Sequence, residues 1–179
     1  MRKLRIVLFS GPFKVGKSTV TGELFQQFGY SKISSSDYLR SLTPGLEQLD
    51  IAQVRLRLQE KGDELDRQTD FCWVVDPVAT SVIANAPKVS AWLFDSVRKR
   101  RQVEHFRERF GSAVIHIHLT APDDVLRTRS GLSETAYTAA ISHSNEVNAR
   151  SLGNIADQVF DTTLHTAHEI AAQISKVGG

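Results

Sequence analysis

The stretch Gly11-Pro12-Phe13-Lys14-Val15-Gly16-Lys17-Ser18 constrains the fold of this chain more than any other feature. It fits the pattern G-x-x-x-x-G-K-[ST] without a mismatch. An apolar run at residues 4–10 predicts a buried strand before it, and apolar residues at helical spacing predict a helix over residues 17–28 after it. A strand, a glycine-containing turn and a helix in this order direct main-chain N–H groups and a helix N-terminus at one point, which favours the binding of a phosphate chain.

The residue types in this stretch predict separate roles in holding a nucleotide. Gly16 lets the main chain come close to a phosphate, Lys17 can reach the β- and γ-phosphates, and the Ser18 hydroxyl can ligate Mg²⁺. The sequence therefore predicts ATP and Mg²⁺ as cofactors. The predicted nucleotide-binding residues are Gly11, Phe13, Lys14, Val15, Gly16, Lys17, Ser18 and Thr19.

The rest of the chain alternates between strand and helix patterns. Further strands are expected at residues 30–33, 90–94, 112–120 and 158–161, and further helices at 46–65, 72–84, 99–110, 133–152 and 165–176. Such alternation predicts an α/β domain with a parallel sheet and helices on both of its faces. We find no repeat or linker, so residues 1–179 are expected to form a single domain.

Composition limits the partners that the chain can have. The formal net charge of +2 is too small to bind nucleic acid by bulk electrostatics, so nucleic acid is an unlikely partner. The single cysteine, Cys72, excludes an intrachain disulfide and favours a reducing compartment. No stretch approaches the roughly 20 apolar residues that cross a bilayer. We expect a cytoplasmic protein with no membrane partner. The oligomeric state stays open, with a homodimer as one alternative.

Polar residues at the end of the third expected strand are candidates for the reaction centre. Parallel sheets bind ligands at the carboxyl ends of their strands. Asp95 is expected to hold a Mg²⁺-bound water, and Arg98 to grip a phosphate of the acceptor with its planar guanidinium. Gln102 would share a helical face with Arg98 and offer an amide to a base. The alternative is a solvated basic helix start, because residues 98–101 are all basic.

Two further groups of side chains are candidates for acceptor binding and for closure. After the second strand, Asp37 could bind a hydroxyl or cap a helix, and Arg40 could meet an acceptor phosphate. After the fourth strand, Arg127 and Arg129 are expected to close over the transferring phosphoryl group, with Arg150 as a weaker candidate. We expect residues 127–150 to form a short lid, the alternative being a solvated helix end.

Two histidines alternate in the fourth expected strand. His116 and His118 would face the same side of the sheet, a spacing that can bind a metal ion. No third ligand is evident in the sequence, so we interpret them as histidines that hydrogen-bond inside the fold.

These segments together resemble the nucleoside monophosphate kinases, and among them the deoxynucleoside monophosphate kinases of phage type. That group carries the P-loop, a segment of the form R-x-x-L-Q-x-x-G-[TD]-E-x-x-R followed by tryptophan, and a D-x-R…E segment after the third strand. The corresponding residues here are Arg55, Leu58, Gln59, Gly62, Glu64, Arg67 and Trp73, then Asp95, Arg98 and Glu104. The spacing from Arg98 to Gln102 is also similar to the adenylate kinase motif D-G-F-P-R-T-x-x-Q, with one residue fewer after Asp95.

The resemblance implies a three-layer P-loop kinase fold with the strand order 2-3-1-4-5. It implies that residues 46–85 are a helical insertion for the acceptor and that Arg67 and Arg98 bind the acceptor phosphate, with Gln59 and Trp73 also in the substrate site. The implied reaction moves the γ-phosphate of Mg·ATP onto a (deoxy)nucleoside monophosphate, a small-molecule acceptor.

Departures from the family pattern leave the acceptor open. Asp63 stands where the family often has threonine, and the spacing after Arg98 differs. A likeness to dephospho-CoA kinases at the P-loop and at Ile155-Ala156-Asp157 keeps dephospho-CoA as an alternative acceptor. The others are a nucleoside, a modified base or an end in a polynucleotide, and a module that binds ATP without efficient transfer.

Overall fold

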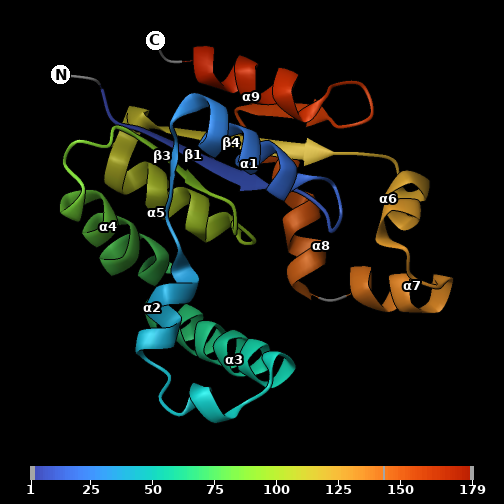
Figure 1. Ribbon diagram of the computed structural model, residues 1–179, viewed down its shortest axis with the longest axis horizontal. Helices are drawn as coiled ribbons and strands as arrows, with labels where there is room; N and C mark the ends of the chain where they lie inside the picture. Colours follow the sequence, from blue (N-terminus) through green and yellow to red (C-terminus); the bar gives the residue numbers. More distant parts are fainter. Residues whose placement is uncertain (1–2, 143, 178–179) are drawn as a thin grey trace.

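The computed structural model describes residues 3–142 and 144–177. Its centre is a parallel sheet whose strands follow the order β2-β3-β1-β4-β5, as predicted (Figure 1). The strands are β1 (Arg5–Ser10), β2 (Ser31–Lys32), β3 (Ala91–Phe94), β4 (Val114–Thr120) and β5 (Gln158–Asp161). In the centre, Ile6 of β1 pairs with Trp92 of β3 on one side and with Val114 of β4 on the other.

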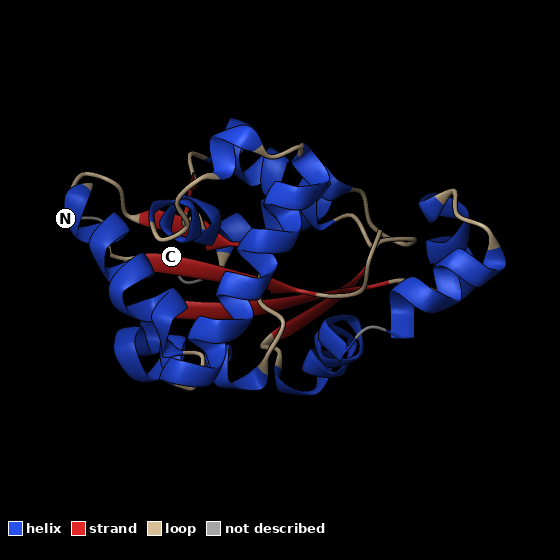
Figure 2. Cartoon of the chain, turned by 90° about the horizontal axis from the view of Figure 1, so that it is seen from below, coloured by secondary structure: helices blue, strands red, loops and turns tan. Residues whose placement is uncertain are grey.

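Two apolar clusters cover the two faces of this sheet. Side chains alternate along β1, so Ile6 and Leu8 enter one cluster while Val7 and Phe9 enter the other, and all four are fully buried. The first cluster packs against α5 (Arg100–Phe110) and against residues 73–79, and the second against α1 (Lys17–Phe28) and α9 (Ala167–Lys176). Figure 2 shows the strands lying between these helical layers. The predicted three-layer α/β fold is therefore confirmed.

The segment between β2 and β3 is more broken than the sequence pattern predicts. It contains α2 (Ser35–Ser41), a 3-10 turn (Leu46–Gln48), α3 (Ile51–Thr69), a second 3-10 turn (Cys72–Val74), a π turn (Val75–Ala79) and α4 (Thr80–Asn85). The expected helix over 46–65 was wrong at both ends, because α3 begins at Ile51 and ends at Thr69. It begins later because Asp50 caps it by accepting from the N–H of Gln53. Figure 1 shows α3 standing away from the sheet, whereas Val74, Val75, Val78 and Ala79 belong to the core.

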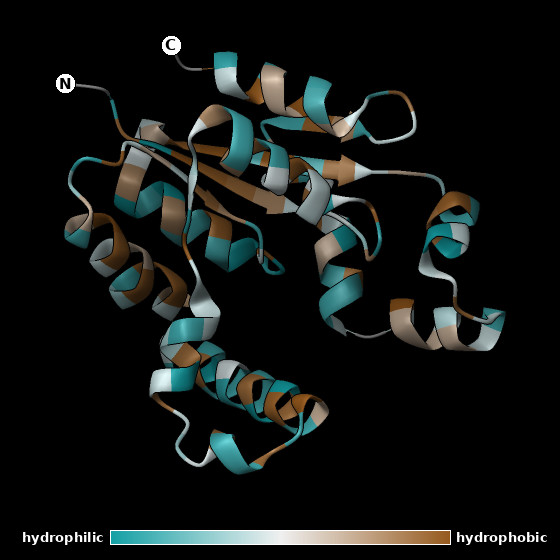
Figure 3. Cartoon of the chain, in the orientation of Figure 1, coloured by the Kyte–Doolittle hydropathy of each residue, from teal (hydrophilic) through white to brown (hydrophobic). Residues whose placement is uncertain are grey.

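The segment after β4 contains α6 (Asp123–Ser130), α7 (Glu134–Ser142), α8 (Ser144–Ser151) and a 3-10 turn (Leu152–Ile155). It lies beyond the carboxyl ends of β1 and β4 (Figure 1). The expected single helix over 133–152 is described as α7 and α8, and His143 between them lies outside the described residues. Figure 3 shows that the central strands are the most hydrophobic elements, while α3 mixes both kinds of residue. Across residues 3–142 and 144–177, no helix has the length and apolar content that a membrane span requires.

Candidate active site

The loop between β1 and α1 has the main-chain geometry of an anion cradle. Gly11 and Gly16 have φ angles of 135° and 100°, where a glycine is favoured, and Lys14 also has a positive φ of 63°. A Cβ added to Gly11 would collide with the carbonyl oxygen of Leu119 on β4. The main-chain N–H groups of Lys14, Gly16, Lys17 and Ser18 have no hydrogen-bond partner among the described residues, so they are available to phosphate oxygens.

Lys17 lies within this cradle. Its Nζ donates to the carbonyl oxygens of Gly11 at 2.6 Å and Pro12 at 3.0 Å. Burial lowers the pKa of Lys17 to about 8, while the charge of Glu146 acts in the opposite direction, Arg98 lowers the value and Asp95 raises it. These charges therefore lie near the Lys17 ammonium, so the fold gathers Lys17, Asp95 and Arg98 as the sequence predicts. The Ser18 hydroxyl is exposed at the same loop, where it could hold a magnesium ion.

A buried hydroxyl joins the base of the loop to β4. Ser10 Oγ lies 2.7 Å from His116 Nε2 and 2.9 Å from His118 Nδ1, and Ser10 is fully buried. Burial lowers the pKa of each histidine to about 4, so both rings are neutral at pH 7 and the hydroxyl can donate to one and accept from the other. No group of three metal-binding side chains occurs in the described part of the chain. The histidines are thus structural partners of the loop, although His116 Nδ1 lacks a hydrogen bond among those residues.

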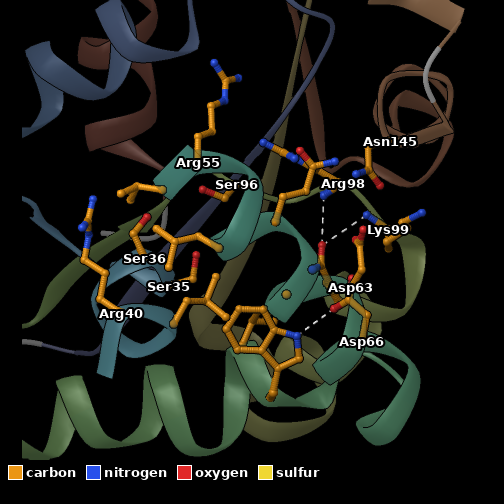
Figure 4. A pocket seen from close by; sticks show the side chains of 18 of the residues that line it. Ser35, Ser36, Arg40, Arg55, Asp63, Asp66, Ser96, Arg98, Lys99 and Asn145 are labelled. Carbon is orange, nitrogen blue, oxygen red and sulfur yellow. Dashed lines mark hydrogen bonds between the residues drawn. The ribbon is translucent and has the colours of Figure 1, made fainter. Parts of the chain in front are cut away.

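A cavity of about 540 Å³ lies beside the loop, between α3 and the carboxyl end of β3. Its charged lining consists of Arg40, Arg55, Arg98, Lys99, Asp63 and Asp66, a formal excess of two positive charges. Figure 4 shows these side chains around the cavity, with Asn145 contributed by α8. Apolar walls are formed by Leu39, Leu49, Ile51, Val54, Leu58, Trp73, Val74 and Phe94.

The structure brings several, but not all, of the predicted substrate residues to this cavity. Arg40, Gln59, Trp73, Arg98 and Gln102 line it. Trp73 is 5% exposed and stacks on Tyr38 with ring centroids 6.0 Å apart, so it forms a wall with only an edge accessible.

Two of the predicted substrate residues lie elsewhere. Arg67 is on the exposed part of α3 and does not line the cavity. Asp37 lines a smaller cavity of about 260 Å³ formed with Lys32, Tyr38 and Pro77.

Asp95, the residue predicted to hold a magnesium-bound water, already has partners within the protein. Lys32 Nζ lies 2.8 Å from its Oδ2, and Ser96 donates to its Oδ1.

The expected lid contains a hydrogen-bonded network centred on Arg150. Its guanidinium donates to Asp123 at 2.7 Å, to Tyr137 at 3.3 Å and to Glu146 at 3.3 Å. The hydrogen bond from Arg150 keeps the pKa of the Asp123 carboxyl below its usual value. Arg150 thereby connects α6, α7 and α8.

The two arginines favoured as lid ligands lie outside this network. Arg127 is exposed, and its guanidinium has neither a hydrogen bond nor an ion pair among the described residues. Arg129 donates to the hydroxyl and carbonyl oxygens of Thr162, after β5. Their roles as phosphate ligands therefore remain predictions.

Sequence reasoning missed Glu146, which connects the lid segment to the phosphate loop. Its Oε1 accepts a hydrogen bond of 2.6 Å from the main-chain N–H of Phe13, and its side chain is only 14% exposed. The i, i+4 spacing to Arg150 signals a helical ion pair but not the contact with a loop 133 residues away. The sequence also gave no strong signal for Lys99, Ser96 or Asn145 in the cavity.

Comparisons with known proteins agree with this geometry. No protein-family model matches the chain. The chain is 26% identical to adenylate kinase isoenzyme 1 of Cyprinus carpio over 148 residues. This alignment covers 82% of this chain and 72% of the Cyprinus carpio protein. The chain is 24% identical to the human adenylate kinase isoenzyme 1 over 131 residues, covering 72% of this chain and 64% of the human protein.

Solved structures share the fold at low identity. A dephospho-CoA kinase from Campylobacter jejuni has a TM-score of 0.54 at 12% identity and covers 94% of each chain. A shikimate kinase from Acinetobacter baumannii has a TM-score of 0.52 at 14% identity, covering 96% of this chain and 90% of its own. A sugar kinase from a Janibacter species has a TM-score of 0.52 at 18% identity, covering 96% of this chain and 92% of its own.

The phosphate loop, the strand order and these similarities together place the fold of this chain in the class of P-loop kinase folds. Within that class its sequence relatives are adenylate kinases, whereas the solved structures that share its fold carry the names of kinases for several different acceptors.

Proposed function

We propose that the protein transfers the γ-phosphoryl group of Mg·ATP to a phosphate oxygen of a nucleoside monophosphate. An oxygen of the acceptor phosphate forms a bond to the γ-phosphorus, the bond to the bridging oxygen breaks, and ADP leaves. A phosphate acceptor is already ionised at neutral pH, so the step needs no general base. Positioning and neutralisation of charge supply most of the catalysis in phosphoryl transfer.

The residues of the loop and its surroundings fit Mg·ATP. Its triphosphate would be held by the unpaired N–H groups of Lys14, Gly16, Lys17 and Ser18 and by the Lys17 ammonium. Ser18 and Asp95 would hold the magnesium ion, directly or through water. The ion supplies neutralisation of the β- and γ-phosphate oxygens.

The observation that carries the acceptor assignment is the charge of the cavity. A lining with four basic and two acidic side chains has a formal excess of two positive charges, which matches the charge of a phosphate dianion. Neutral sugars or nucleosides would leave these cations uncompensated. Arg98 lines the cavity, and its charge acts on Lys17, so we place it at the end of the cavity that faces the loop. From there it would hold an acceptor phosphate near the transferred group.

A coupled ADP-release assay over a panel of acceptors tests this proposal. The panel contains ribo- and deoxyribonucleoside monophosphates, the parent nucleosides, shikimate and dephospho-CoA, and labelled ATP with oligonucleotides completes it. We expect turnover only with monophosphates. Preference for another acceptor, or ATP consumption that is indifferent to every acceptor, would contradict the proposal.

A further inference from the structure

Gln102 presents a hydrogen-bond donor to the acceptor cavity in a fixed orientation. Its side chain is more than nine-tenths buried, and its Oε1 accepts from the main-chain N–H groups of Arg98 at 2.9 Å and Lys99 at 3.2 Å. Two N–H groups can be satisfied only by the oxygen, so the amide cannot be reversed. Its NH₂ group has no partner among the described residues, and the residue lines the cavity. It therefore offers donors to a ligand.

Asp63 and Asp66 present acceptors to the same cavity. They lie three residues apart on α3, so both face the cavity, and neither has an ion-pair partner in the described part of the chain (Figure 4). Asp66 Oδ1 accepts from Trp73 Nε1 at 2.7 Å, and Oδ2 has no donor among the residues that the structure describes. The charges of Lys99 and Arg98 act on Asp66, so the carboxylates lie near the residues that hold Gln102.

Burial raises the pKa of Asp66, and the charge of Asp63 acts in the same direction. The hydrogen bond from Trp73 and the charges of Lys99 and Arg98 lower this pKa but do not reverse the shift. Partly buried acceptors that lack donors are stabilised by a ligand that brings N–H groups to them.

A cavity lined by the Gln102 amide donor and two carboxylate acceptors matches one base better than the others. Guanine has an adjacent acceptor and two donors on one edge: O6, N1–H and the 2-amino group. Adenine and cytosine offer one amino donor, and thymine offers one N–H between two carbonyl oxygens that a carboxylate would repel. Resting on the function proposed above, we infer that Gln102, Asp63 and Asp66 select guanine, so that the acceptor is a guanosine or deoxyguanosine monophosphate.

Initial rates and equilibrium binding by calorimetry test this selection. The ligands are dGMP, dAMP, dCMP and dTMP, with GMP and inosine monophosphate, which lacks only the 2-amino group. We expect kcat/KM for dGMP at least about tenfold above the other deoxynucleotides, and a loss of roughly tenfold from GMP to inosine monophosphate, because a site built to hydrogen-bond a group rejects the analogue that lacks it.

Asp63→Asn and Asp66→Asn keep the side-chain shape and remove the charge. Each should lower kcat/KM for dGMP by roughly 10- to 100-fold and leave dTMP unchanged or better. Gln102→Glu keeps an acceptor for the N–H groups of Arg98 and Lys99 but presents oxygen to O6, so it should abolish the preference for guanine. Glu60→Gln, on the exposed face of α3, is the matched control and should change nothing.

Three results would overturn the inference. The first is a best substrate other than dGMP, and the second is an equal loss of kcat/KM for all four bases in the Asp63→Asn and Asp66→Asn variants. The third is a larger effect of the 2′-hydroxyl than of the base on kcat/KM, because that result would assign the carboxylates to ribose. Binding separates this inference from the proposed function. Selective binding of dGMP without turnover would contradict only the phosphoryl transfer, and unselective binding would contradict only the guanine assignment.

Discussion

The phosphate loop and the acceptor cavity lie next to each other but are built differently. The loop, residues 11–19, offers the main-chain N–H groups of Lys14, Gly16, Lys17 and Ser18 and the partly buried ammonium group of Lys17. The cavity consists of side chains from α2, α3, the end of β3, α5 and α8. A ligand in the loop is therefore recognised by backbone geometry that nine consecutive residues encode, whereas a ligand in the cavity is recognised by side chains that only packing brings together.

The sharpest test of the loop is the removal of the Lys17 ammonium group. Lys17→Ala should lower kcat by about 100- to 1000-fold, because a preorganised charge at the transferred phosphate is lost. Steady-state kinetics at saturating acceptor measures this, with circular dichroism to show that the fold is kept. Lys88→Ala, in an exposed loop, is the control. A rate near that of the unmodified protein would remove the loop from the mechanism.

The corresponding test of the cavity should affect the other substrate. Arg98→Ala should raise the KM for the acceptor by roughly 10- to 100-fold, the effect of losing a hydrogen bond to a charged group, and leave the Kd for ATP unchanged. Arg98→Lys should restore part of the loss, because it keeps the charge without the planar fork.

Arg100→Ala, which removes an exposed side chain of the same basic run, should leave both constants unaltered. A weaker Kd for ATP with a normal acceptor KM in Arg98→Ala would instead assign Arg98 to the donor side.

The loop and the cavity should also differ in their response to pH. Burial lowers the pKa of Lys17 to about 8, so the ammonium is largely protonated at pH 7 and largely neutral at pH 9. Because a triphosphate binds the charged form, the affinity for ATP should fall about tenfold between pH 7 and pH 9. Calorimetry across this range measures the change. Lys17→Ala, although weaker, should show a flatter profile, and an affinity that is constant or rises would contradict the assignment.

The smallest effect is expected where the lid segment meets the loop. The Glu146 carboxylate occupies the N–H of Phe13 and lies near Lys17, so a bound triphosphate would bring like charge beside it. Glu146→Gln keeps an acceptor and removes the charge, and should tighten ATP binding roughly fivefold, the equivalent of about 1 kcal/mol.

Glu134→Gln, on α7, is the matched control for this variant. A Kd that weakens with Mg²⁺ but not in its absence would show that Glu146 holds the ion instead.

Much of the fold could be predicted because its signals are local. The run from Ile6 to Phe9 is fully buried, as a strand covered on both faces must be, and the loop follows it directly. His116 and His118 face the same side, as strand alternation requires, and both meet Ser10. The ends of α3 were missed, because caps and tertiary packing override the helical periodicity.

The sequence by itself determined the phosphate loop, since its glycines, its lysine and its flanking strand and helix are contiguous and their geometry is set by local sterics. Only the tertiary structure decided which charges line the cavity. The cavity is lined by Arg55, Lys99, Asp63 and Asp66, but not by Arg67 or Asp37. Glu146 contacts the loop although it lies 133 residues from Phe13 in the sequence. The reason is physical: the direction of a side chain on a helix is set by how the whole helix packs, which no short pattern in the sequence records.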